Sequence, residues 1–148
     1  MITDNLEITG ALQISLNNEI VHQCDNLVVT AGKNWVANRF KDGGGGFTQL
    51  GEMTHMAVGS GSAAAAVGNT ALGTELNRIA LTTAGGTVSN ATIQYDATWS
   101  DSVGALAIEE AGIFNASSAG DMLARTVFAI INKGTDDTVS ISWTITVS

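Results

Sequence analysis

Closely spaced glycines and a serine follow an apolar run at residues 54–62, THMAVGSGS, a pattern that could hold a phosphate group. A P-loop of this kind needs a lysine directly after its last glycine, and this stretch contains none. A dinucleotide-binding loop needs a third glycine that opens a helix, but after Gly59 and Gly61 that position is occupied by Ala64. We therefore expect residues 59–73 to form a loop after a strand and to bind no phosphate.

Metal-ligating and nucleophilic residues are few and scattered. His22 and Cys24 are two residues apart and would share one face of a strand, but no third ligand stands near them, and His55 stands alone. Zinc takes three or four such ligands. The Gly-x-Ser-x-Gly motif of serine hydrolases is also absent from the sequence. These observations predict a protein with no cofactor, no metal site and no enzymatic activity.

Glu109 and Glu110 form the only adjacent acidic pair inside an apolar run, LAIEEAGIF. On a strand the two side chains point to opposite faces, so they cannot act together as the paired carboxylates of a glycosidase. One of them must face the interior or an interface, where a carboxylate needs a cationic partner. Arg78 and Arg125 both interrupt strand-like runs. We expect Glu110 to form a structural ion pair with one of these two arginines.

Apolar and polar residues alternate in several short runs, as in half-buried β-strands. The clearest run is residues 139–147, with apolar side chains at every odd position. Further strands are expected at residues 7–16, 19–29, 53–58, 76–81, 88–99, 106–114 and 122–131. Turn residues bound these runs, so the pattern predicts one antiparallel β-sandwich or jelly-roll-like domain over residues 1–148. The N-terminal hairpin, residues 1–25, is a candidate arm.

One short α-helix is expected near residues 30–40, where Trp35 and Phe40 fall at helical spacing. We expect these two aromatic residues to plug one end of the core and Phe114 and Trp143 to fill it. A run of four glycines, Gly43 to Gly46, follows the helix and predicts a mobile loop. The candidate loops for contact with a neighbouring chain contain Gly43, Gly46, Gly59, Gly61 and Gly73.

The composition indicates which partners the chain can have. Its net charge of −8 disfavours binding to nucleic acid, and no run of about 20 apolar residues predicts a membrane span. Only 14% of the 148 residues are charged, against about 25% in typical domains, whereas Gly, Thr, Ala and Ser are abundant. Low charge is typical of the centre of protein interfaces, which favours burial against partner chains. The alternative is a self-contained β domain.

Four segments in order resemble bacteriophage tail-fibre and collar-fibre proteins, especially their N-terminal attachment domains; the last of them is the closing strand at residues 136–147, DDTVSISWTITV. Residues 26–40, NLVVTAGKNWVANRF, look like the family's strand, turn and first helix. Residues 53–78 carry a His-x-Ala-Val-Gly-x-Gly run and a Leu-x-x-Glu-x-x-Arg segment. Residues 106–126 carry an Ile-x-Glu-x-Gly run and end in a strand that contains Leu-Ala-Arg. The family's usual proline after Val-Gly-x-Gly is replaced here by alanines at 63–66.

The resemblance implies a non-enzymatic virion structural protein of the tail, neck or collar, assembled in the bacterial host cytoplasm. It implies a symmetric assembly, a homotrimer or larger ring, with other virion proteins as partners. A capsid decoration (cement) protein is an alternative. A second alternative, a carbohydrate-binding β module, would require exposed aromatic residues, for which Tyr95 and Trp99 are the candidates.

Overall fold

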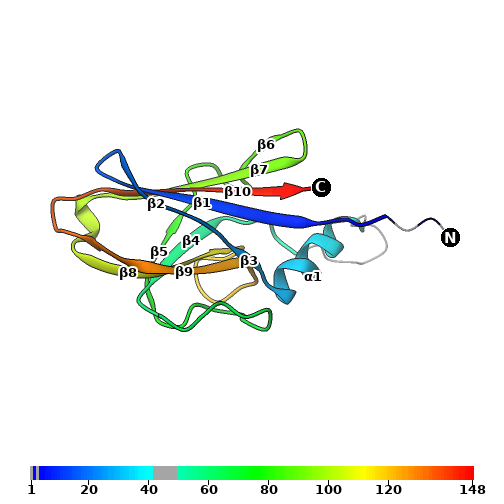
Figure 1. Ribbon diagram of the computed structural model, residues 1–148, viewed down its shortest axis with the longest axis horizontal. Helices are drawn as coiled ribbons and strands as arrows, with labels where there is room; N and C mark the ends of the chain where they lie inside the picture. Colours follow the sequence, from blue (N-terminus) through cyan, green and yellow to red (C-terminus); the bar gives the residue numbers. More distant parts are fainter. Residues whose placement is uncertain (1, 3, 42–49) are drawn as a thin grey trace.

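The computed structural model describes residues 2, 4–41 and 50–148, which fold into two stacked antiparallel sheets with one helix at one end (Figure 1). Sheet A has the strand order β2-β1-β10-β7-β6, and sheet B has the order β3-β9-β8-β4-β5. The elements are β1 (Ile8–Leu16), β2 (Glu19–Asp25), β3 (Leu27–Val28), α1 (Thr30–Arg39), β4 (His55–Gly59), β5 (Glu75–Ala80), β6 (Thr87–Ser89), β7 (Thr92–Trp99), the 3-10 turn Asp101–Val103, β8 (Leu106–Phe114), β9 (Met122–Lys133) and β10 (Val139–Val147). The predicted all-β sandwich with one short helix is confirmed.

The N-terminal hairpin is an integral part of sheet A, so the prediction that it could form an arm is wrong. β1 lies between β2 and β10; it pairs with β10 over its whole length and with β2 from Ala11 to Leu16. Asn17 and Asn18 both have positive φ, as the tight turn between β1 and β2 requires. The backbone N–H of Ser148 donates to the carbonyl of Glu7, at 2.9 Å, so the two ends of the sandwich chain lie side by side.

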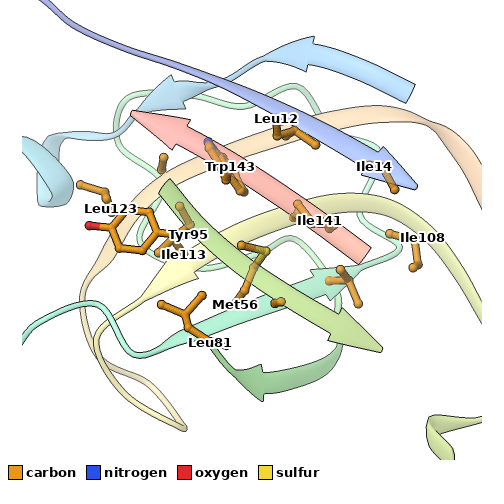
Figure 2. Packing of buried hydrophobic residues seen from close by; sticks show 14 of the residues in the cluster. Leu12, Ile14, Met56, Leu81, Tyr95, Ile108, Ile113, Leu123, Ile141 and Trp143 are labelled. Atoms are coloured by element: carbon orange, nitrogen blue, oxygen red, sulfur yellow. The ribbon is translucent and has the colours of Figure 1, made fainter. Parts of the chain in front are cut away.

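The core lies between the two sheets and follows the predicted alternation of β10. Figure 2 shows side chains from both sheets meeting there, among them Trp143 and Tyr95 from sheet A and Ile113 from sheet B. Trp143 is fully buried, as predicted, and its indole Nε1 donates to the side-chain oxygen of Asn26 at 2.9 Å. This hydrogen bond satisfies the one polar group that the large side chain brings into the core.

The predicted long strand at residues 88–99 is instead a hairpin of β6 and β7. Asn90 has a φ of 52° at the turn between them. Asparagine tolerates this left-handed conformation because its short polar side chain can bond locally. The alternation of polar and apolar residues continues through the turn, so the pattern alone does not reveal it.

Helix α1 packs against β9 through Gly32, where a Cβ atom would overlap the carbonyl of Leu123. Trp35 is half-buried at the edge of the core, and its Nε1 donates to the carbonyl of Gly51 at 2.7 Å. Phe40 is 78% exposed, so its placement in the core is wrong. It directly follows the helix, one turn after the half-buried Val36, at a point where the sandwich no longer covers it.

Candidate functional site

The outer face of sheet B carries the charged pair that the sequence predicts. Ala111 and Ile113 of β8 point into the core, so Glu110 and Gly112 point to the outer side. Arg125 of β9 lies opposite Gly112 in the antiparallel register and therefore on that same side. Strand alternation thus brings the carboxylate and the guanidinium together on a face that would otherwise be open to solvent.

Glu110 and Arg125 form a buried ion pair, with exposed fractions of 0% and 2%. The guanidinium Nη2 lies 2.8 Å from Glu110 Oε2, and Nε donates to the same oxygen at 2.9 Å. Such charge-assisted hydrogen bonds are about twice as strong as neutral ones. The predicted pairing of Glu110 with an arginine therefore holds for Arg125.

The glycine-rich loop of residues 60–74 seals this pair from solvent, and its backbone completes the carboxylate's hydrogen bonds. The N–H groups of Gly61 and Thr74 donate to Glu110 Oε1 at 2.8 and 2.7 Å, and that of Gly73 donates to Oε2 at 2.8 Å. A Cβ on Gly59 or Gly61 would overlap the carboxylate. The glycines thus form an anion cradle whose anion is the chain's own side chain.

These contacts fix both ends of the 60–74 loop inside its own chain. Gly59 is the last, buried residue of β4, while Gly61 and Gly73 hold Glu110. Each of these three glycines has a specific close neighbour within its own chain. Contact with a neighbouring chain through the exposed middle of the loop stays a prediction. Gly43 and Gly46 lie outside the described residues.

Arg125 also holds the middle of the loop. Its Nη1 donates to Asn69 Oδ1 at 2.9 Å, and its Nη2 donates to the carbonyl of Ala63 at 3.1 Å. Asn69 Oδ1 in turn accepts the N–H of Ala66 at 2.8 Å. The role of Asn69 has no signal in the sequence, since it lies 56 residues from its arginine.

The cradle keeps Glu110 ionised. Burial alone raises the pKa of its carboxyl, but hydrogen bonds from Thr74 and Gly73, from Arg125 and from Gly61 more than compensate, and the pKa is lowered. Five donors already use the carboxylate oxygens. The group is therefore a fixed anion that organises the loop, with no lone pair directed at solvent for proton transfer.

Arg78 does not pair with Glu110, so that alternative is wrong. Its guanidinium pairs with Glu75 at 2.6 Å and lies 3.7 Å above the ring of the buried Phe114. Its Nη1 also donates to the carbonyls of Ala116 and Ala119, both at 2.9 Å, and so fastens the loop after β8.

A bulge explains this pairing within β5. In a regular strand, residues three apart point to opposite faces. Here Val58 faces Asn77 but Gly59 faces Glu75, so one residue of β5 is skipped. The extra residue brings Glu75 to the same side as Arg78.

The other residues considered for chemistry serve packing. His22 packs against Phe128 with tilted rings whose centroids are 5.4 Å apart, and Cys24 Sγ lies 3.5 Å from the hydroxyl of Thr126. Burial, the larger influence, raises the pKa of the Cys24 thiol, which makes it a poor nucleophile. Within residues 2, 4–41 and 50–148, no three His, Cys, Asp or Glu side chains gather in a way that could hold a metal ion.

A buried lysine is a functional group that the sequence analysis missed. Lys133 ends β9 with an exposed fraction of 1% and donates from Nζ to the carbonyl of Gly104 at 2.7 Å. This bond ties the end of β9 to the segment before β8. Its position at the end of an apolar strand resembles that of an ordinary solvent-facing lysine, so the sequence gives no warning.

Two further results bear on identity. In the part of the chain that the structure describes, none of the helical segments has the length and apolar character needed to cross a lipid bilayer. Comparisons of the chain with protein-family models, with curated proteins and with solved structures find no significant match.

Proposed function

We propose that the chain is a non-enzymatic structural protein of a bacteriophage particle, a fibre or attachment component of the tail, neck or collar that assembles into a symmetric oligomer. The observation that carries this proposal is the convergence of two segments that resemble phage fibre proteins. Residues 53–78 supply the cradle of N–H groups, and residues 106–126 supply Glu110 and Arg125. The resembling motifs therefore meet in one structural unit.

The chemistry of that unit favours a structural role over a catalytic one. Its charged groups are buried against one another, and Glu75 and Arg78 of the same motifs are likewise paired. Motifs whose charges are satisfied internally specify a loop conformation, which is what an assembly component must present reproducibly to its neighbours.

The outer face of sheet A supplies a second, independent support. It is built from small polar side chains, including Ser140, Ser142 and Thr144 of β10. Charged residues are few on this face, as at the centre of protein interfaces. A broad, low-charge sheet face can contact another chain without the cost of desolvating many ions.

The carbohydrate-binding alternative loses the residues on which it depends. Tyr95 and Trp99 are both fully buried in the core, and Trp99 Nε1 donates to Asn77 Oδ1 at 3.0 Å. Neither ring can stack on a sugar. A capsid decoration protein would have the same architecture as a tail, neck or collar component but a different location in the particle. The labelling experiment below therefore distinguishes the two.

Sedimentation velocity and light scattering on the purified chain test the assembly. We expect a stable homotrimer or larger ring. Electron microscopy of phage particles labelled with an antibody against the chain then tests the location. Label at the tail, neck or collar supports the proposal, and label over the capsid indicates a decoration protein. A monomer at all concentrations, together with unlabelled particles, would contradict the proposal.

A further inference from the structure

Both sheets leave a strand edge unpaired on the same side of the sandwich, which we call the open side. It consists of β2 in sheet A and of residues 126–132 of β9 in sheet B. Within the described residues, β1 is the one strand that pairs with β2. β3 pairs with β9 over two residues only, Leu27 and Val28. Residues 126–132 therefore pair with β8 on one edge and have no strand partner among the described residues on the other.

The two unpaired edges lie one above the other. Cys24 Sγ of β2 is 3.5 Å from the hydroxyl of Thr126, and the rings of His22 and Phe128 pack with their centroids 5.4 Å apart. Figure 1 shows the chain passing here from β2 in the upper layer to β3 in the lower one. Because stacked sheets are about 10 Å apart, the open side presents two strand edges at that spacing.

The opposite side of the sandwich is closed by its own chain. Leu81 follows β5 and is buried, and the N–H of Thr82 donates to the carbonyl of Asp96 in β7 at 2.8 Å. The edge strand β6 has three residues, and β5 carries the ion pair of Arg78 and Glu75. Short and charged edges resist pairing with other strands, so this side offers little to another chain.

Exposed apolar side chains accompany the open side. Ile20 and Val21 of β2 are 57% and 45% exposed, and Ile130 of β9 is 52% exposed. Ala129, next to Ile130, is exposed as well. Pairing with another strand would remove this apolar area from water and satisfy the backbone groups of the edges at the same time.

Charged groups bound the open side and leave its middle neutral. Glu19 and Asp25 stand at the two ends of β2. The buried Arg125 and Lys133 stand before and after the unpaired part of β9. Between these residues, the two edges contain no Asp, Glu, Lys or Arg. Glu109 of the neighbouring β8 is half-buried, so the accessible charge around the open side is acidic.

A bulge also interrupts each of the two edges. The register of β2 shifts opposite Ile14 and Ser15, and that of β9 shifts opposite the stretch from Ile108 to Glu110. Bulges and charged ends keep an edge from pairing with arbitrary strands. A contact at the open side is therefore selective for a partner of matching shape.

We propose that the open side of one copy binds the open side of a second copy, with β2 beside β2 and β9 beside β9. A single extended peptide has one strand to offer, whereas a second sandwich brings two edges at the matching spacing of about 10 Å. A twofold axis perpendicular to the sheets makes both strand pairs antiparallel and continues each sheet across the contact. This inference rests on the self-assembly in the proposed function and narrows its larger ring to an even number of copies.

Lysine substitutions in each layer test the contact. Ile20→Lys charges the edge of β2 and Ile130→Lys charges that of β9, and we expect each to weaken self-association at least about 10-fold in sedimentation equilibrium. Val88→Lys on β6 is the matched control, because it replaces an exposed apolar residue (69%) and changes the net charge equally. It should alter association less than about 2-fold. All three variants should keep the far-UV circular dichroism of the wild type, since the replaced side chains are exposed.

Hydrogen exchange locates the contact on the wild-type chain. Amide protons in peptides from β2 and from residues 126–132 should exchange at least about 10-fold more slowly at concentrations where the chain is associated than where it is dissociated. Peptides from β5 and β6 should exchange at the same rate under both conditions. Protection of β5 and β6 in place of β2 and β9 would overturn the proposed contact.

Salt gives an independent readout, because the rim of the open side is acidic in both copies. Raising the ionic strength from about 0.01 M to about 1 M shortens the Debye length from about 30 Å to about 3 Å and screens this repulsion. Association should therefore strengthen several-fold at high salt. Weakening at high salt would show that opposite charges hold the copies together, and the open side would not be the contact.

The outcomes separate this inference from the proposed function. An even number of copies that both Ile20→Lys and Ile130→Lys dissociate supports the contact. An oligomer with an odd number of copies, or one that either variant leaves intact, overturns the two-layer contact while the assembly stands. A wild-type chain that stays monomeric up to about 100 μM, well above typical subunit affinities, overturns both.

Discussion

The outer faces of the two sheets differ in whether their polar side chains are exposed to solvent or covered by the chain. On sheet A, Gln13 and Gln23 bond each other across β1 and β2 while exposed, at 3.0 Å, and Thr98 and Ser140 do so across β7 and β10 at 2.9 Å. On sheet B, the 60–74 loop covers the pair of Glu110 and Arg125 completely. Strand alternation says only which side chains turn away from the core. What covers them depends on segments far away in the sequence.

This difference decides how much each interaction contributes to stability. Exposed polar pairs gain little, because water competes for both partners, and their net value is about 0–1 kcal/mol. A buried pair costs much more to break, because removal of one partner strands an uncompensated charge. The two faces therefore predict a graded series of mutational effects.

Removal of the guanidinium should have the largest effect. Arg125→Ala leaves Glu110 buried without its cation and frees Asn69 and the carbonyl of Ala63. We expect a loss of about 3–5 kcal/mol in the free energy of unfolding, measured by urea denaturation. Arg39→Ala is the matched control. Its side chain is exposed and lies 4.9 Å from the Trp35 ring, so its loss should cost at most about 1 kcal/mol. Equal effects would show that the pair on sheet B is not sealed.

Low pH should weaken the pair of Glu110 and Arg125, because protonation removes the charge of the carboxylate and leaves every heavy atom in place. Because the folded-state pKa of Glu110 is lowered, its contribution is full above the ordinary glutamate pKa of about 4.3 and is lost as the pH falls through the folded pKa. Urea midpoints from pH 7 to pH 3 should therefore fall less steeply for Glu110→Gln than for the wild type.

A second carboxylate contributes to the acid sensitivity of the chain. Asp137, whose pKa is lowered by hydrogen bonds from Asn17 and from the N–H of Gly134, should leave some acid sensitivity in Glu110→Gln. A wild-type slope in Glu110→Gln would mean that its cradle does not form.

A glycine pair tests the fit of the covering loop. In Gly61→Ala the new methyl group meets the Glu110 carboxylate and Gly73, and the loop must shift. We expect a loss of about 1–3 kcal/mol, typical of overpacking. Gly68→Ala is in the same loop but meets no atom within 4 Å, so it should be neutral or slightly stabilising. Similar melting temperatures for the two variants would indicate a loop that adapts freely.

The sequence predicts the strands because their periodicity is local. The bounds of β8 and β10 match the expected residues 106–114 and 139–147. The buried carboxylate at Glu110 is also predictable, since a charge inside an apolar run must find a partner. The exposure of Phe40 could not be predicted in this way. Helical spacing places it one turn after Val36 but does not indicate where the sandwich ends.

The arginine that pairs with Glu110 and the loop that covers the pair could not be predicted, because both depend on how distant strands align. Arg78 and Arg125 both interrupt apolar strands, and only the pairing of Gly112 with Arg125 places one of them beside Glu110. The bulge in β5 diverts Arg78 to Glu75. The cradle joins Glu110 to N–H groups 36 to 49 residues earlier, and backbone donors have no sequence signature.

The smallest effect is expected on sheet A, and it sharpens the comparison most. Gln13→Ala removes one exposed hydrogen bond and should change the free energy of unfolding by less than about 0.5 kcal/mol. If the loss exceeds about 1.5 kcal/mol and grows with protein concentration, another copy covers this face in solution. Sheet A would then be sealed between chains as sheet B is sealed within one, which is the contact that the proposed function allows. A small, concentration-independent change would mean that this face stays open to solvent and that the oligomer contact lies elsewhere.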